Sequence, residues 1–476
     1  MSPAAEHLVK KLVVLAVLVG LGSALAFLVV ASASGGSSAA TRRVSVSSSG
    51  VQADRDTYAA GLSASGRYVL LNSLAYHLVP GDTNKRWDVF VHDRSTGATT
   101  RVSVSSQGDQ ARATRDPWGG STAGAISGNG RYVVFQSDAP NLVPGDTNRV
   151  QDVFLHDLKT GRTSRLSIGR RGRQANGPSG AATISANGRS VAFESFASNL
   201  VAGDKNRATD VFVRDLARGN TTRVSVTTHG AEARCKDGCE SSEPALSANG
   251  RYVAFQSSAT NLVPGDTNKL GDVFVHDRHT GRTERVSVTS AGKQAGGDKT
   301  NNGSNAPAIS SDGRYVAFHS ADSNLVSGDT NRTFDIFVHD RKTARTTRIS
   351  VGSNGHQANG ESLGALSVSA DGRYVAFTSL ASNLVPGDAN EITDVFVRDL
   401  RAGKTTLASL GDAGEQGGDA STVSGVAFSA DDRLLAFSSW ASNLVPGDTN
   451  STPDAFLREF PGTSRYSGLG VEGRSR

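Results

Sequence analysis

The hydrophobic and polar positions of this chain follow one pattern that recurs seven times. A Gly-Arg-Tyr step or a variant of it marks each copy, at intervals of 58 to 64 residues: Gly66, Gly130, Gly188, Gly250, Gly313, Gly372 and Asp432. A fixed period of this kind is typical of a solenoid, a propeller or another repeat array. The repeat, represented by residues 244–288, therefore defines the architecture of nearly the whole chain.

Each copy predicts four short strands and no helix. Apolar and polar residues alternate at a period of two, and glycine-containing turns separate the runs. In the central copy the expected strands are 244–247, 251–257, 272–277 and 285–288, with tight turns at 249–250 and 280–281. We expect an all-β fold, a seven-bladed β-propeller of four-stranded antiparallel blades.

Two apolar positions repeat in every copy, as packing between neighbouring blades requires. On the first strand they are Leu62, Ile126, Ile184, Leu246, Ile309, Val368 and Phe428. On the second strand they are Leu71, Phe135, Phe193, Phe255, Phe318, Phe377 and Phe437. Apolar residues at a period of two need no cofactor to explain them.

The first 33 residues differ from the rest of the chain. Lys10 and Lys11 precede an uncharged stretch, 12–30, and Ala31-Ser32-Ala33 has the small residues of a cleavage site. The length of the stretch favours a membrane anchor, whereas the Ala-x-Ala sequence favours a signal peptide, and both alternatives stay open. On either one, the lysines stay inside and the propeller is exported. We expect an extracytoplasmic protein, membrane-anchored or secreted.

The two ends of the repeat region have complementary defects. Arg43-Val44-Ser45-Val46 matches a fourth strand but precedes the first copy, whereas the last copy lacks its fourth strand. We therefore expect the N-terminal strand to complete the seventh blade, which removes the exposed edges of an open array. The expected organisation is a flexible linker at 34–42, the propeller at 43–460 and a disordered tail at 461–476. Outside the reducing cytoplasm, Cys235 and Cys239 are expected to form a disulfide.

Strand alternation places all long connections on one side of the propeller, the loop face, and the tight turns on the other side, the turn face. Loops on a rigid scaffold commonly carry binding sites. The connections between blades repeat a glutamine or its near equivalent, at Gln52, Gln110, Gln174, Glu232, Gln294, Gln357 and Gln416. These side chains either stabilise turns or present a polar ring to a ligand.

The long connection within each copy has Asp, then Asn two residues later, then Asp six residues after the first. The residues are Asp82, Asn84 and Asp88; Asp146, Asn148 and Asp152; Asp204, Asn206 and Asp210; Asp266, Asn268 and Asp272; Asp329, Asn331 and Asp335; Asp388, Asn390 and Asp394; and Asp448, Asn450 and Asp454. Oxygen ligands at such spacing suit Ca²⁺, which would relieve repulsion between the carboxylates. Alternatively, the first Asp and the Asn hold a turn and the last Asp ties the loop to the third strand.

The charges predict a polarised domain. The long connections hold fourteen of the 45 acidic residues, although the formal net charge is +5. The turn face is expected to be basic, through Arg278, Arg282, Arg285, Lys159, Arg162, Arg341 and Arg345. A basic patch can bind nucleic acid, but export and the lack of interleaved aromatic residues argue against a nucleic-acid partner.

The repeat sequence resembles a known family. The stretches SSDGRYVAFHS, SADGRYVAFTS and SANGRYVAFQS, followed by DIFVHD or DVFVHD and then TxRxSV, are similar to the WD40-like (PD40) repeat of the TolB β-propellers over about seven-eighths of the chain. The resemblance implies a propeller that binds other proteins, or that gates a separate catalytic domain. The sequence shows neither the additional N-terminal domain of TolB nor the hydrolase domain of propeller peptidases, so a Tol-Pal role is not expected.

Signals of catalysis are weak. His92, His156, His276 and His339 share one position that is Arg in other copies, which indicates a solvated strand position. No HExxH motif occurs. Departures from the repeat on or near the long loops, Arg234, Trp118, Trp440 and His356, are candidates for a concealed site. Two hypotheses follow: a monomeric scaffold that binds a protein or envelope glycan on its loop face, or a lyase or hydrolase with a site at the axial mouth.

Overall fold

The computed structural model describes residues 40–112, 119–234, 239–296, 303–423 and 427–460. The expected signal or anchor segment, the linker up to residue 39, the tail at 461–476, Trp118 and Cys235 lie outside the described residues. The chain divides into two units, Met1–Ser37 and Ser38–Arg476, and the described residues belong to the second.

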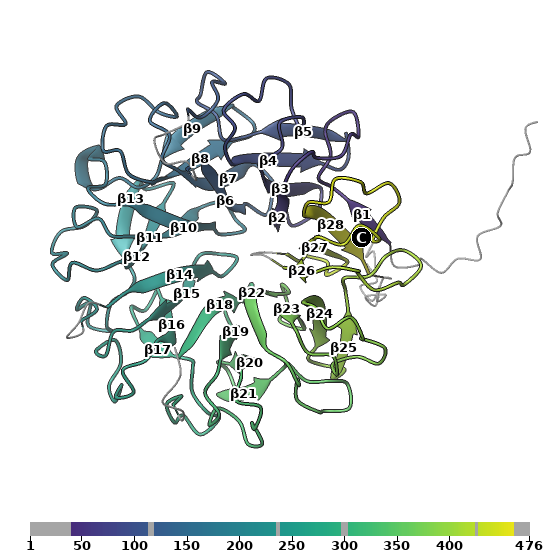
Figure 1. Ribbon diagram of the computed structural model, residues 1–476. Helices are drawn as coiled ribbons and strands as arrows, with labels where there is room; N and C mark the ends of the chain where they lie inside the picture. The colour runs from purple at the N-terminus through teal and green to yellow at the C-terminus, as the bar shows by residue number, and fades with distance from the viewer. Residues whose placement is uncertain (1–39, 113–118, 235–238, 297–302, 424–426, 461–476) are drawn as a thin grey trace, which may run out of the picture. The chain divides into compact units, whose positions relative to one another are not determined.

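Seven four-stranded antiparallel sheets stand around a common axis in the second unit (Figure 1). Blade 1 holds β2 (Thr57–Leu62), β3 (Tyr68–Ser73), β4 (Asp88–Asp93) and β5 (Ala98–Arg101). Blade 2 holds β6 (Ser121–Ile126), β7 (Tyr132–Ser137), β8 (Asp152–Asp157) and β9 (Arg162–Arg165). Blade 3 holds β10 (Ser179–Ile184), β11 (Ser190–Ser195), β12 (Asp210–Asp215) and β13 (Asn220–Arg223), preceded by a short 3-10 turn, η1 (Arg170–Gly172).

The remaining four blades have the same strand order. Blade 4 holds β14 (Ser241–Leu246), β15 (Tyr252–Ser257), β16 (Asp272–Asp277) and β17 (Thr283–Arg285). Blade 5 holds β18 (Ser304–Ile309), β19 (Tyr315–Ser320), β20 (Asp335–Asp340) and β21 (Arg345–Arg348). Blade 6 holds β22 (Ser362–Val368), β23 (Tyr374–Ser379), β24 (Asp394–Asp399) and β25 (Lys404–Leu407). Blade 7 holds β26 (Ser421–Thr422), β27 (Leu434–Ser439), β28 (Asp454–Glu459) and β1 (Thr41–Arg43). The seven-bladed all-β prediction is confirmed.

The N-terminal strand closes the ring, as its sequence predicts. β1 pairs with β28 in antiparallel register, with Thr41 opposite Arg458 and Arg43 opposite Phe456. The backbone N–H of Val44 continues the ladder by donating to the carbonyl of Ala455 at 2.8 Å. In Figure 1 the purple β1 lies beside the yellow β28, so residues from the two ends of the propeller share one sheet.

The fourth strand lies earlier in each repeat than the sequence predicts. In blade 4 it covers Thr283–Arg285, where the pattern predicts 285–288. The regular backbone ladder ends because a side chain takes the place of the next carbonyl acceptor. Ser287 Oγ accepts a hydrogen bond from the N–H of Val273 at 3.1 Å. The first strand is also longer than predicted, since β14 starts at Ser241. As a result Arg285 ends its strand instead of starting it.

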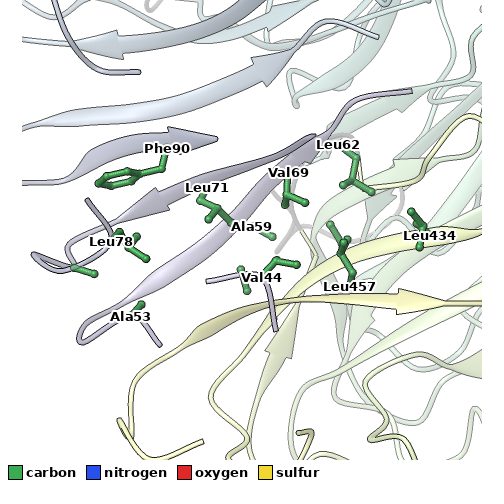
Figure 2. Packing of buried hydrophobic residues seen from close by; sticks show 13 residues of the cluster. Val44, Ala53, Ala59, Leu62, Val69, Leu71, Leu78, Phe90, Leu434 and Leu457 are labelled. Carbon is green, nitrogen blue, oxygen red and sulfur yellow. The ribbon is translucent and has the colours of Figure 1, made fainter. Parts of the chain in front are cut away.

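The core lies between neighbouring blades. Phe255 on β15 and Phe274 on β16 are fully buried and stack with ring centroids 5.8 Å apart, and five other blades have the same pair. Figure 2 shows how Leu62 and Val69 of blade 1 face Leu434 and other apolar side chains of blade 7. The apolar positions of the second strand are buried as predicted.

The repeated glycine after the first strand serves both the turn and the packing. Gly130 has φ of 72°, and a Cβ there would lie 2.2 Å from the ring of Tyr68 in the preceding blade. A side chain would therefore need a left-handed backbone and would also collide with the neighbouring blade.

The prediction that the repeated histidines are solvated is wrong. His276 is 7% exposed, and its Nδ1 lies 2.9 Å from Thr283 Oγ1. Arg398, at the same position of blade 6, places Nη1 2.9 Å from Thr405 Oγ1. Both residue types thus meet the same threonine hydroxyl, which explains why they exchange between copies without a solvated position.

Within the part of the chain that the structure describes, no helix combines the length and hydrophobicity needed to cross a membrane.

Candidate functional site

In six of the seven blades, the long connection on the loop face is held by an arginine from the end of the fourth strand. In blade 4, Arg285 Nη1 lies 3.4 Å from Asp266 Oδ1 and 3.2 Å from Asp272 Oδ2. Gln294 Nε2 donates to Asp266 Oδ1 at 2.9 Å, and Asn268 Nδ2 donates to Asp272 Oδ2 at 3.4 Å. We call this set of two aspartates, Asn, Gln and Arg the loop clamp. It brings together the predicted metal residues and the predicted polar ring.

The clamp arginine recurs in six blades. The residues are Arg101, Arg165, Arg223, Arg285, Arg348 and, from the N-terminal strand, Arg43. Blade 6 has Leu407 at this position. Arg285 was expected among the basic residues of the turn face, and this assignment is wrong, because the shifted fourth strand brings its guanidinium to the loop aspartates.

Burial dominates the electrostatics of the clamp. It raises the pKa of Asp272 to about 6 and that of Asp88 to about 7, although hydrogen bonds from Ser287 and Ser103 favour the charged forms. The negative charge of the first aspartate of the loop, Asp266 or Asp82, raises these pKa values further, and the positive charge of the clamp arginine lowers them. The loop face therefore holds protons more tightly than free carboxylates do.

One hydrogen bond in the Asp-x-Asn loops agrees with the interpretation that the Asn stabilises a turn. Asn268 Oδ1 accepts a hydrogen bond from the backbone N–H of Leu270 at 3.1 Å, which fixes the turn. Among the described residues, no three or more His, Cys, Asp or Glu side chains form a group that could hold a metal ion. The guanidinium supplies a positive charge between the two carboxylates where Ca²⁺ was hypothesised. Calcium binding stays a prediction, with a protein cation as its competitor.

The repeated glutamines are engaged in the same loops. Gln110 Oε1 accepts from the N–H of Thr83 at 3.3 Å, while its Nε2 donates to Asp82 Oδ1 at 3.0 Å. Gln52, Gln174, Gln294, Gln357 and Gln416 also hydrogen-bond to the long connections, and Glu232 makes ion pairs with Arg223 and Arg234. These contacts favour the turn-stabilising alternative over a ring presented to a ligand.

The turn face has its own ion pairs. Arg251 donates from Nε and Nη2 to both oxygens of Asp277, at 2.8 and 2.7 Å, and its guanidinium lies 4.8 Å from the centre of the Tyr252 ring. The hydrogen bond from the equivalent Arg131 holds the pKa of Asp157 at about 2. Of the basic residues expected on this face, Arg282 and Arg341 form ion pairs with Glu284, at 3.2 and 2.6 Å.

An axial cavity of about 740 Å³ runs between the first strands of the blades. Its wall consists mainly of small and aliphatic side chains, and among the described residues that line it only Glu243 and His319 are titratable. Glu243 Oε2 accepts from the N–H of Ala306 at 2.8 Å, and burial lowers the pKa of His319 to about 4. A catalytic site at the axis would need a convergent cluster of histidine, arginine, tyrosine and carboxylate side chains, and the described wall has two such groups.

Exposed large apolar side chains gather on one face. Among the described residues there are five of them, and all lie in or beside connections of the loop face: Val51, Phe196, Leu363, Leu380 and Trp440. Phe196 is 53% exposed and Trp440 is 38% exposed. Except for Trp440, the sequence analysis missed them. A blade-by-blade comparison of the residue after each second strand would have found Phe196 and Leu380.

The other predicted departures from the repeat do not converge. Arg234 lies between blades 3 and 4, where its Nη2 is 3.5 Å from Glu232 Oε1. His356 is exposed between blades 5 and 6. Cys239 is buried and disulfide-bonded, while its expected partner Cys235 lies outside the described residues.

Comparison with known proteins gives a fold but no family assignment by sequence. No family model matches the chain, and no curated protein matches it. An oligogalacturonate lyase in complex with manganese superposes with a TM-score of 0.50 at 12% identity, covering 88% of this chain and 93% of the lyase. TolB from Acinetobacter baumannii superposes with a TM-score of 0.38 at 14% identity, covering 72% of this chain and 63% of TolB. The chain has a β-propeller fold.

A third similar structure is the propeller domain of the Trilobed protease from Pyrococcus furiosus, with a TM-score of 0.47 at 11% identity, covering 85% of this chain and 95% of that domain. The expected resemblance is thus confirmed as a likeness of fold. At these identities it carries no information on activity.

Proposed function

We propose that the protein is an exported, membrane-associated or secreted binding scaffold that recognises a protein or an envelope glycan through its loop face. The observation that carries the proposal is the gathering of all five exposed large apolar side chains of the described residues on that face. Single exposed apolar residues are normal on any protein surface, but the confinement of all five to one face favours that face as the interaction surface.

The loop clamps suit such a role. In blade 3, Arg223, Asp204 and Asp210 tie a long connection to the rigid sheet through contacts of 3.2 and 3.0 Å. A loop that is fixed before the partner arrives loses less conformational entropy on binding. The loop face is therefore preorganised, while its apolar side chains vary from blade to blade.

The alternative is an extracytoplasmic lyase or hydrolase with its site at the axial mouth. Glu243 and His319 would be its titratable groups, and the cavity has the volume of a small-molecule site. The wall offers His319 as a neutral base at pH 7, because burial lowers its pKa to about 4. The apolar wall and the paired Glu243 carboxylate favour binding over proton transfer.

Site-directed photo-crosslinking of the full-length protein in producing cells tests the proposal. A photoreactive phenylalanine analogue replaces Phe196 or Leu380 on the loop face, and Lys342, exposed on the turn face, serves as the matched control. We expect adducts from positions 196 and 380 and none from position 342. Adducts confined to position 342, or equal from both faces, would contradict a loop-face scaffold.

A further inference from the structure

Three aromatic side chains meet on the loop face where blade 7 joins blade 1. Tyr58 belongs to β2, Trp87 directly precedes β4, and Trp440 directly follows β27. The ring of Tyr58 lies 5.8 Å from that of Trp87, tilted by 33°, and 5.7 Å from that of Trp440, in an edge-on arrangement at 64°. Trp440 is 38% exposed and the other two are half-buried. We call these three residues the aromatic cluster.

The repeat provides an internal control for the cluster. At the position of Tyr58 the other blades have Thr122, Gly180, Ser242, Asn305, Leu363 and Thr422. At the position of Trp87 they have Gln151, Thr209, Gly271, Phe334, Thr393 and Pro453. At the position of Trp440 they have Leu74, Asp138, Phe196, Ser258, Ala321 and Leu380. No other junction between these blades has more than one aromatic residue at the three positions. Six junctions pack without the trio, so blade packing does not require it.

Polar groups beside the cluster also depart from the repeat. In the long connection, four other blades have a Ser-Asn step and blades 2 and 4 have Pro-Asn and Thr-Asn, whereas blade 1 has Tyr76 and His77. The guanidinium of Arg55 lies 4.6 Å from the centre of the Tyr76 ring, and Asp54 Oδ1 accepts from the N–H of Tyr76 at 3.0 Å. The changes that distinguish blade 1 thus lie on the same side of the molecule as the aromatic cluster.

Asp56 gives the cluster a hydrogen-bond acceptor. Its backbone carbonyl accepts from the N–H of Leu74, but its carboxylate makes no hydrogen bond or ion pair with any described residue. The carboxylate is close enough to Tyr58 that its charge adds to burial in raising the pKa of the phenol. An unengaged acceptor therefore lies near the half-buried Tyr58 of the aromatic cluster.

A sugar ring fits this combination. One face of a pyranose presents C–H groups, which are attracted to the electron-rich face of an aromatic ring, while its edge carries hydroxyl donors for a carboxylate. A protein hot spot would instead place its aromatic anchors in a well-packed, fully desolvated pocket, whereas Trp440 is 38% exposed. We propose that the aromatic cluster binds an uncharged saccharide, with Trp440 and Tyr58 stacking on sugar rings and Asp56 accepting from hydroxyls. This inference rests on the proposed loop-face binding and names its ligand class.

Tryptophan fluorescence of the full-length protein provides the test, because Trp87 and Trp440 are two of the three tryptophans. The ligands are cellohexaose and the N-acetylglucosamine hexamer, with polygalacturonate as the anionic comparison. We expect a saturable fluorescence change with at least one neutral oligosaccharide and none with polygalacturonate. Trp440→Ala should weaken binding at least about threefold. The control is Lys342→Ala, an exposed residue on the turn face, which should leave the affinity unchanged.

Isothermal titration calorimetry and Tyr58→Leu, which keeps an apolar side chain but removes the ring, repeat the measurement without relying on tryptophan emission. No saturable signal with either neutral oligosaccharide overturns the inference, as does equal weakening by Lys342→Ala or preferred binding of polygalacturonate. If saccharide binding fails while adducts still form at positions 196 and 380, the loop-face scaffold stands and only the saccharide is wrong. A third outcome is that no saccharide binds and that Trp440→Ala abolishes a protein adduct at position 196 or 380. That outcome would overturn the saccharide inference and assign the aromatic cluster to a protein contact.

Discussion

Arg348 Nη1 lies 3.2 Å from Oδ1 of Asp329, the first aspartate of the long connection in blade 5. The same nitrogen lies 3.4 Å from Asp335 Oδ2, so one guanidinium neutralises both carboxylates. In blade 6 the equivalent residue is Leu407. There Gln416 Nε2 bridges the carboxylates by donating to Asp388 Oδ1 and Asp394 Oδ2, at 2.7 and 2.8 Å, and Asn390 Nδ2 also donates to Asp394 Oδ2 at 3.0 Å. Blade 6 therefore holds two carboxylates without the cation that the other blades provide.

Removing and adding this cation should have opposite effects on stability. Arg348→Leu removes the cation that lies between two buried carboxylates and is expected to cost about 3 kcal/mol of unfolding free energy. Leu407→Arg supplies the missing partner and is expected to stabilise the protein by about 1 kcal/mol. Urea unfolding measures both, with Arg345→Leu, an exposed change on the turn face, as control. Equal effects of Arg345→Leu and Arg348→Leu would contradict the clamp.

The contrast between the fold and the clamp shows what the sequence can predict. The period of the repeat and the unmatched strand at Arg43 were enough to predict seven blades and their closure. The role of Arg285 was missed because a shift of two residues in the fourth strand decides which face it reaches, and the hydroxyl of Ser287 sets that shift. The aromatic cluster could not be predicted without the closed ring, because Tyr58 and Trp440 become neighbours only when blade 7 meets blade 1.

Deletion of residues 1–46 tests the closure. The truncated chain loses β1, the buried Val44, and the contacts of Arg43 with Asp448 and Asp454 at 3.6 and 3.8 Å. We expect a loss of at least about 3 kcal/mol, together with a less cooperative transition, because blade 7 then exposes an edge. Deletion of residues 1–39, which keeps β1, is the control. Identical unfolding of the two truncated proteins would rule the arrangement out.

Calcium titration separates the two interpretations of the Asp-x-Asn loops. Because an arginine already bridges the carboxylates in six blades, we expect no change in melting temperature at millimolar Ca²⁺. Heat of binding at several sites, with a raised melting temperature, would instead support the calcium hypothesis. If binding occurs at one site that Leu407→Arg abolishes, the metal is confined to blade 6.

The histidine position should tolerate arginine better than alanine. His276 is buried, and burial lowers its pKa to about 4, so it is neutral at pH 7. His276→Arg can reproduce the contact that Arg398 makes with Thr405, and we expect a cost within about 1 kcal/mol. His276→Ala removes both the packing and the hydrogen bond to Thr283, at a cost of about 2 kcal/mol. Thermal unfolding that ranks arginine below alanine would contradict this assignment.

The carboxylates of the two faces should change the stability of the propeller in opposite directions as pH rises. On the loop face, burial raises the pKa of Asp272 to about 6 from its ordinary 3.8, so the folded protein binds more protons than the unfolded chain between pH 4 and 7. Stability therefore falls as pH rises through that window. On the turn face, the hydrogen bond from Arg131 lowers the pKa of Asp157 to about 2. Its contribution is fully present above pH 4 and is lost as pH falls toward 2.

Stability should accordingly be greatest between about pH 4 and 5. Urea midpoints at pH 3, 4.5 and 7.5 measure it, and we expect the highest value at pH 4.5. Asp146→Asn removes a loop-face group whose pKa burial raises to about 6, so it should flatten the decline from pH 4.5 to 7.5. Arg131→Leu should flatten the decline below pH 4 instead, because Asp157 then loses its partner. A midpoint that rises steadily from pH 4.5 to 7.5 would mean that the clamp arginines outweigh burial, and that the loop carboxylates are fully charged in the folded protein.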